Sequence, residues 1–326
     1  MSGIRGFVIL ILALALAACG TGQPMSAAVP LETKRIALTF DDVPRDAGAF
    51  LDPDERAERL RAGLKNAGVE QAAFFVNPSM FADRPSGLAH LAGYMADGHV
   101  IANHSSTHPR LSQVPAAQYI ADIDAAQAWL SLLPNHRPWF RYPYLDEGGE
   151  DAAKRDALRA ALAERGLSNG YVTVDASDWF YEDAARQAVR AGKRIDRDAL
   201  RDLYVESHLE AAEFYDLLAR KTIGRSPAHV LLLHETDLAA LFVGDLVEAL
   251  EARGWEIISA DEAYADPIGG YTATYDTPAA QGTLIEQVAW QGGQPAPRWY
   301  ERNDTRVARA EFDRRVLGTQ APAGPQ

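Results

Sequence analysis

The stretch Arg35-Ile36-Ala37-Leu38-Thr39-Phe40-Asp41-Asp42 sets the pattern for the whole chain. Its largely apolar first part has the composition of a buried β-strand, and two adjacent carboxylates follow at the strand's carboxyl end. The same order, a strand followed by polar residues that can carry chemistry, recurs along the sequence. This recurrence predicts both the fold and the place of the functional site.

Strands and helices alternate over more than 200 residues. We expect strands at 34–40, 71–76, 99–102, 139–141, 171–174, 229–233 and 255–258, and helices at 54–66, 88–96, 116–133, 152–165 and 238–253. Such alternation indicates an α/β fold whose parallel sheet is closed, or nearly closed, into a barrel. In (β/α) barrels the carboxyl ends of the strands carry the chemistry. The polar residues predicted at those ends are Asp41, Asp42, His104, His108, Arg141, Asp175, Asp178 and His234.

Two histidines in the segment Asn103-His104-Ser105-Ser106-Thr107-His108-Pro109 are separated by four positions. On a helical turn this spacing places both rings on one face, where they can share an ion. Two histidines and one carboxylate, with a position open for water, form the ligand set of a hydrolytic Zn²⁺ site. The second carboxylate of the Asp41-Asp42 pair is then a candidate general base.

Five short motifs, in this order, resemble the polysaccharide deacetylases of the NodB-homology type, carbohydrate esterase family 4. They are Thr39-Phe40-Asp41-Asp42, His104 to Pro109, Arg141-Tyr142-Pro143-Tyr144, Asp175-Ala176-Ser177-Asp178-Trp179 and Leu232-Leu233-His234. The resemblance covers about residues 34–262. It implies a distorted (β/α) barrel and metal-dependent removal of acetyl groups from amino sugars or acetylated polysaccharides.

The resemblance also implies a role for each motif. Asp41 is the base that activates metal-bound water, and Asp42, His104 and His108 are the metal ligands. Arg141 pairs with the base, and the backbone N–H of Tyr144 helps to hold the oxyanion. His234 is the acid, oriented by Asp178. Substrate contacts are expected from Trp179, which walls the groove, from Leu232, which lines the acetyl pocket, and from Tyr142 and Tyr144, which can stack on a sugar.

Each motif taken alone has a structural alternative. The aspartate pair can form a turn and helix cap, the histidine pair an exposed polar turn, and Arg141 a structural salt bridge. Asp178-Trp179 can be a cap beside a core aromatic, and His234 a buried histidine with its hydrogen bonds satisfied. All five motifs occur together in family order, which favours one site. The other histidines, at 90, 99, 136, 208 and 229, are expected to be structural, and Glu235 is a weak candidate for the site.

The N-terminal residues have the features of a bacterial lipoprotein signal. Arg5 precedes an apolar run from Gly6 to Ala18, and Leu16-Ala17-Ala18-Cys19 resembles a lipobox around the single cysteine of the chain. We expect residues 1–19 to be the signal peptide, with lipidation at Cys19, and 20–32 to be a tether. The alternative is an ordinary secretory peptide. The predicted location is the periplasmic side of the cell envelope, on the outer membrane if the host is Gram-negative.

The remaining chain is expected to be a deacetylase barrel at 33–265, with a helical insertion at 180–226, and an irregular extension at 266–326 that is disordered at its end. The formal net charge of −13 argues against nucleic acid or a polyanionic glycan as the bulk partner, although a local basic groove remains compatible with it.

Three functions fit these features. The first is an envelope-anchored deacetylase for an N-acetylated or O-acetylated glycan, with Zn²⁺ or another divalent ion such as Co²⁺, Ni²⁺ or Fe²⁺. The second is a carbohydrate-binding lipoprotein without activity, which is expected to have lost a catalytic group. The third is a hydrolase for a non-sugar amide or ester.

Overall fold

The computed structural model describes residues 33–277 and 280–318. The expected signal peptide with Cys19, the tether at 20–32 and the last eight residues lie outside this range. Within it, no helix is both long and apolar enough to cross a membrane.

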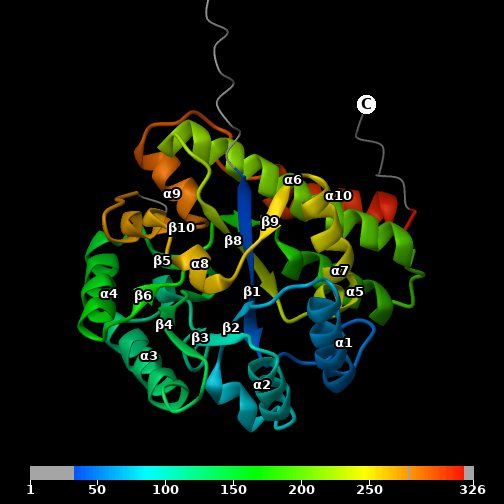
Figure 1. The fold of residues 1–326 in the computed structure, drawn as a ribbon, viewed down its shortest axis with the longest axis horizontal. Helices are drawn as coiled ribbons and strands as arrows, with labels where there is room; N and C mark the ends of the chain where they lie inside the picture. The colour runs from blue at the N-terminus through cyan, green and yellow to red at the C-terminus, as the bar shows by residue number, and fades with distance from the viewer. Residues whose placement is uncertain (1–32, 278–279, 319–326) are drawn as a thin grey trace, which may run out of the picture. The chain divides into compact units, whose positions relative to one another are not determined.

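A parallel sheet is built around β1 (Lys34–Val43), which is the expected first strand extended through both aspartates. The order along the sheet is β6-β4-β3-β2-β1-β8-β7, and β9 also pairs with the start of β1. Figure 1 shows β1 passing through the middle of the fold. The other strands are β2 (Ala73–Val76), β3 (Val100–Asn103), β4 (His136–Phe140), β6 (Ser168–Asn169), β7 (Val174–Asp175), β8 (Ala228–His234) and β9 (Trp255–Ile257).

The segment 168–175 pairs with both edges of this sheet. Its first half, β6, pairs with β4, and the N–H of Gly170 donates to Phe140 O at 2.7 Å. Its second half, β7, pairs with β8, and the N–H of Thr173 donates to Val230 O at 3.0 Å. The sheet therefore curls into a distorted, nearly closed barrel. The single strand expected at 171–174 is replaced by two short ones, because the chain must cross from one edge to the other.

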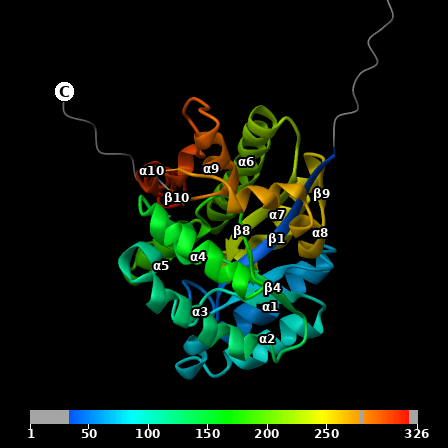
Figure 2. The ribbon, with the colours of Figure 1, turned by 90° about the vertical axis from the view of Figure 1, so that its left-hand side faces the viewer.

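Helices cover the outside of the sheet (Figures 1 and 2). In α1, Asp52 caps the first turn by accepting the N–H of Glu55, and Leu60 and Leu64 are buried one turn apart on the inner face. The helix expected at 116–133 ends earlier, at Leu130. The covering helices are α1 (Pro53–Asn66), α2 (Gly87–Ala96), α3 (Ala116–Leu130), α4 (Ala152–Glu164), α7 (Asp237–Ala252) and α8 (Ala260–Tyr264), with 3₁₀ turns η1 (Pro78–Ala82), η2 (Leu111–Gln113) and η3 (Pro143–Leu145).

The expected insertion is helical, with α5 (Asp178–Arg190) followed by the long α6 (Arg197–Ile223). The C-terminal extension is more regular than expected: α9 (Leu284–Gln291) packs on α6, and α10 (Thr305–Arg315) packs on α5 and α6 (Figure 2). A capping box formed by Thr283 and Glu286 starts α9. It is a helix signal within a region rich in Gly, Pro and Thr. Its elements are η4 (Pro267–Ala273), β10 (Ala280–Gln281), which pairs with β5 (Asp146–Gly149), α9 (Leu284–Gln291), η5 (Glu301–Asn303) and α10 (Thr305–Arg315).

Candidate active site

Three expected metal ligands meet where β1 and β3 end. Asp42 Oδ1 lies 3.0 Å from Nε2 of His108 and 3.4 Å from Nε2 of His104. One possible ligand atom from each residue lies within 4.8 Å of the other two. The structure therefore brings the predicted carboxylate and both predicted imidazoles to one point.

The histidines reach this point from a loop and not from the expected helical turn. Ser105 and His108 both have positive φ, 64° and 58°, and no helix is present between them. The carboxylate of Asp122 accepts the N–H groups of Ser106 and Thr107, and Ser105 Oγ accepts the N–H of His108. The loop turns back on itself because side chains satisfy its backbone donors, which a helix would have paired internally.

These three residues fit a divalent cation. His104 Nδ1 lies 2.9 Å from the carbonyl of Arg141, so it is the donor and Nε2 keeps a free lone pair. Asp42 Oδ1 is buried and has no hydrogen-bond partner in the described structure. Burial alone would raise the pKa of Asp42, but Arg45 and the two histidines hold it well below its usual value. An ionised, unpaired oxygen beside two imidazole lone pairs is the donor set that zinc and similar ions take.

Asp41 faces the same point and is held by a buried arginine. Arg141 Nη1 donates to Asp41 Oδ1 at 2.6 Å, and Asp41 Oδ2 lies 3.6 Å from His104 Nε2. Both charged side chains are almost fully buried. Arg141 also donates to the carbonyl of Gly170 at 2.6 Å, which ties the crossing segment to β4. The predicted pairing of Asp41 with Arg141 is thus present in the geometry.

His234, at the end of β8, is held by the carboxylate that begins α5. Its Nδ1 lies 2.7 Å from Asp178 Oδ1, and its backbone N–H donates to Asp178 Oδ2 at 2.8 Å. Burial opposes a charge on the ring, but the neighbouring Asp178 raises the pKa of His234 to about 9. His234 is therefore cationic at neutral pH and can donate a proton from Nε2.

These groups border a cavity of about 650 Å³, within the range of ligand sites. Leu232 forms part of its wall, and Tyr144 and Trp179, 48% and 39% exposed, present aromatic surface to it.

The prediction that Tyr142 lines this cavity is wrong. Its side chain is only 3% exposed and packs with Phe140, Leu158 and Tyr119 beneath α3 and α4. Tyr144, two residues on, has a φ of 60°, and this turn separates the two side chains.

Sequence reasoning missed the part of the cavity wall that the C-terminal extension supplies. Trp299 is 48% exposed, and Gln281 Nε2 donates to the carbonyl of Tyr144 at 3.1 Å. The only sequence signal at Glu286 is a capping box, which indicates a helix start and not a site. Nothing in the sequence near Trp299 points to a site. The residues of the wall that were not predicted are Arg45, Arg110, Leu145, Ser177, Asp183, Gln281, Gly282, Glu286, Trp299 and Asn303.

The remaining candidates lie elsewhere or have a different environment. Glu235 is fully buried behind the site, where it accepts the hydroxyl of Tyr94 and the N–H of Arg45. The histidines at 90, 99, 136, 208 and 229 do not line the cavity. Asp175 does line it, and burial raises its pKa to about 6, while burial raises that of Glu286 to about 7.

Comparison with known proteins agrees with the geometry. Residues 28–166 match the family described as polysaccharide deacetylase. A chitooligosaccharide deacetylase from Bradyrhizobium is 33% identical over 149 residues, which are 45% of this chain and 59% of the relative's length.

Solved structures share the fold. A CE4 family pseudoenzyme from Bacillus anthracis aligns with a TM-score of 0.50 at 15% identity, over 71% of this chain and 66% of its own. A family 4 carbohydrate esterase from Streptomyces lividans, in complex with acetate, has a TM-score of 0.46 at 22% identity, over 71% of this chain and 95% of its own. Residues 28–166 are therefore similar to the polysaccharide deacetylase family, and the chain shares its fold with a carbohydrate esterase family 4 protein.

Proposed function

We propose that this protein is a metal-dependent deacetylase that removes acetyl groups from an N-acetylated or O-acetylated glycan at the cell envelope. One observation carries the proposal. Three residues that could hold a cation, a carboxylate held by a buried arginine and a histidine paired with a buried carboxylate all face one cavity. An acetamide needs all three functions to be hydrolysed: an activated water, a base and an acid for the leaving amine.

Asp42, His104 and His108 would hold the ion. The chemistry that a bound divalent cation supplies is a lowered pKa of water, from about 16 towards about 7. Asp41, fixed by Arg141, accepts the proton of the attacking water. The N–H of Tyr144 is our candidate for stabilising the charge that grows on the acetyl oxygen. His234 then gives its proton to the amine nitrogen as the C–N bond breaks, and Asp178 holds the resulting neutral ring in place.

The cavity suits a sugar substrate. Tyr144, Trp179 and Trp299 expose aromatic faces on its walls, and such faces stack on the apolar faces of pyranose rings. The chitooligosaccharide deacetylase relative makes N-acetylglucosamine oligomers the first substrates to try. The lipobox-like sequence around Cys19 supports an envelope location through a lipid anchor.

Acetate release from N-acetylglucosamine oligomers by the zinc-loaded protein tests this function. We expect turnover by the parent and at least a 100-fold loss in Asp41→Asn, which should still bind zinc stoichiometrically. His104→Ala should instead weaken zinc binding itself, measured by calorimetry. Asp54→Asn, on the exposed face of α1, is the matched control and should leave both measurements unchanged.

Two outcomes would contradict the proposal. If the zinc-bound protein releases no acetate from glycans or from an aryl acetate, the protein is a carbohydrate-binding protein without activity. Release from the aryl acetate alone would leave an esterase for a non-sugar substrate.

A further inference from the structure

A small side lobe opens beside the metal-binding residues. It has a volume of about 170 Å³ and shares Asp42, Arg45 and His108 with the catalytic cavity. This volume is below that of sites for whole ligands and corresponds to the space of about five or six water molecules. The lobe can therefore receive a substituent of a molecule that is bound in the main cavity.

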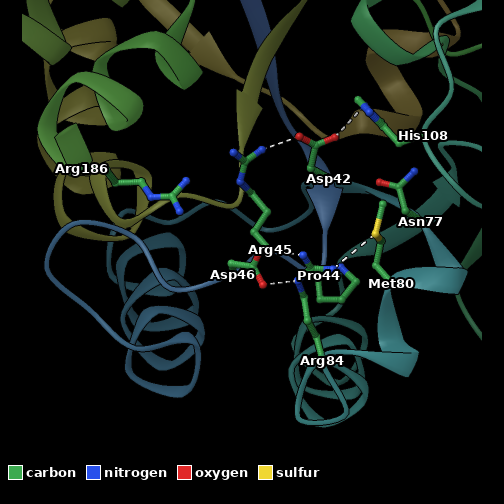
Figure 3. Close-up of a pocket in the computed structure, with 9 residues that line it drawn as sticks. All are labelled: Asp42, Pro44, Arg45, Asp46, Asn77, Met80, Arg84, His108 and Arg186. Carbon is green, nitrogen blue, oxygen red and sulfur yellow. Dashed lines mark hydrogen bonds and ion pairs between the residues drawn. The ribbon is translucent and has the colours of Figure 1, made fainter. Parts of the chain in front are cut away.

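Three guanidinium groups from separate parts of the chain meet at this lobe. Arg45 follows β1, Arg84 follows η1, and Arg186 lies on α5. Figure 3 shows Arg45 reaching up to Asp42, Arg84 bonded to Asp46 below, and Arg186 pointing in from the side. This concentration of cations is a local exception in a chain with a formal charge of −13.

The acidic groups nearby occupy only part of the donor capacity. Arg84 donates to both oxygens of Asp46, at 2.6 and 2.7 Å, and Arg45 donates to Asp42 through Nη1. Arg186 makes one long contact of 3.5 Å with Asp183, and its buried Nε has no partner among the described residues. Arg84 also donates from Nη1 to Met80 Sδ at 3.3 Å. Since a guanidinium has five N–H donors, each of the three arginines still retains donors for a ligand.

Of the other carboxylates near Arg45, Asp183 makes the long contact with Arg186, and two are engaged elsewhere. Asp178 is bonded to His234, and Glu182 accepts the backbone N–H groups of Ala49 and Leu238. With a divalent ion on Asp42, the lining would carry three arginines and the ion against two carboxylates, Asp42 and Asp46. Such a lining would have a net positive charge, which favours an anion.

We propose that this lobe binds an anionic substituent, a carboxylate or phosphate, on the glycan that the protein deacetylates. This inference rests on the proposed function and names its substrate class: an acidic acetylated glycan and not a neutral chitooligosaccharide. Planar guanidinium groups recognise carboxylates and phosphates through paired hydrogen bonds, and the lobe places such groups next to Asp42 and His108.

Calorimetric binding to the zinc-loaded Asp41→Asn protein tests the lobe without requiring turnover. The probes are the N-acetylglucosamine tetramer and a tetramer in which N-acetylmuramic acid, with its carboxylate, alternates with N-acetylglucosamine. We expect the acidic tetramer to bind at least tenfold tighter. Arg84→Gln and Arg186→Gln should each reduce this ratio to about threefold or less, whereas Arg190→Gln, on the exposed side of α5, should keep it.

Equal affinity for the two tetramers, or the same ratio in all variants, would overturn the inference. A phosphorylated tetramer in a third arm distinguishes phosphate from carboxylate as the preferred group. Sodium acetate in a fourth arm tests the reaction product. If only acetate loses affinity in the arginine variants, the lobe serves the product and the inference is wrong. Failure of acetate release with the binding ratio intact would sink the proposed function alone.

Discussion

Asp178 makes two hydrogen bonds with His234: its Oδ1 lies 2.7 Å from the ring Nδ1, and its Oδ2 lies 2.8 Å from the backbone nitrogen. The carboxylate is fully buried, so its charge acts on the ring through a medium of low polarity. The ring is consequently fixed through Nδ1, and it stays protonated at pH values where a free histidine is neutral.

Asp178→Asn should move the alkaline limit of activity to lower pH. In the parent, kcat for an N-acetylated oligosaccharide should fall as pH rises through about 9, where His234 loses its proton. Without the Asp178 charge, burial lowers the pKa of His234, so the fall should begin at lower pH and kcat at pH 8 should drop by about 100-fold. A pH profile of kcat measures this.

An aryl acetate is the matched control substrate, because its phenolate leaves without a proton. For this substrate, the fall of kcat at high pH should depend less on His234. If the alkaline side of the pH profile for the oligosaccharide is unchanged in Asp178→Asn, His234 is not the acid.

The pairing of His234 with Asp178 should also make the free energy of unfolding of the chelator-treated protein depend on pH. Because the pKa of His234 is raised in the folded protein, the pair's contribution to the free energy of unfolding is complete below about pH 6.5. It is lost as the pH rises to about 9.

Arg141→Gln should destabilise the fold as well as stop turnover. The buried guanidinium pairs with Asp41 and bonds Gly170 O and the Tyr264 hydroxyl, so its removal leaves a buried carboxylate without its partner. We expect the free energy of unfolding in urea to fall by about 3–5 kcal/mol. Arg137→Gln, on the strand β4 that precedes Arg141 but paired with Asp261 at the surface, should cost less than about 1 kcal/mol. Equal losses in the two variants would contradict this account.

Most of the barrel could be predicted from the sequence because its strands and helices carry local signals: apolar runs, caps and terminal glycines. The segment 168–175 could not, because its two pairings are decided by strands that lie far away in the sequence. Gly170 marks the crossing, since a Cβ there would lie 2.7 Å from the ring of Phe75. That constraint is tertiary and leaves no periodic pattern.

The site divides in the same way. Asp41, Asp42 and His234 were predictable because each stands at the end of a strand, where the fold itself brings it to the rim. The prediction for Tyr142 was wrong because Tyr144, two residues later, takes a left-handed backbone conformation. The sequence does not show this turn, which separates the two side chains. Trp299 lies about 65 residues beyond the last motif, and only the packing of the extension brings it to the cavity.

Gln281→Ala should lower kcat and leave KM nearly unchanged. Tyr144 and Leu145 have φ of 60° and 50°, a costly conformation for such residues, and Gln281 and Gly282 bond their two carbonyl oxygens. If the Tyr144 N–H stabilises the oxyanion, releasing this clamp misaligns it, and we expect kcat to fall by about tenfold. Gln294→Ala, which removes a similar side-chain bond to the Lys221 carbonyl, is the control. A change in KM alone would assign Gln281 to substrate binding instead.

Trp299→Ala should weaken oligosaccharide binding without slowing the chemical step on a small substrate. Trp299 is 48% exposed on the wall of the catalytic cavity, where its ring can stack on a sugar that lies beyond the one being deacetylated. An aromatic contact worth about 0.5–1.5 kcal/mol corresponds to a rise in KM of about 2- to 12-fold. We expect this rise for the tetramer and none for an aryl acetate. Trp290→Ala removes a ring of similar exposure, 40%, that lies under Arg298 and outside the cavity, and it should change neither value. A rise in KM for both substrates, or for both variants, would mean that the extension supports the fold and does not contact the glycan.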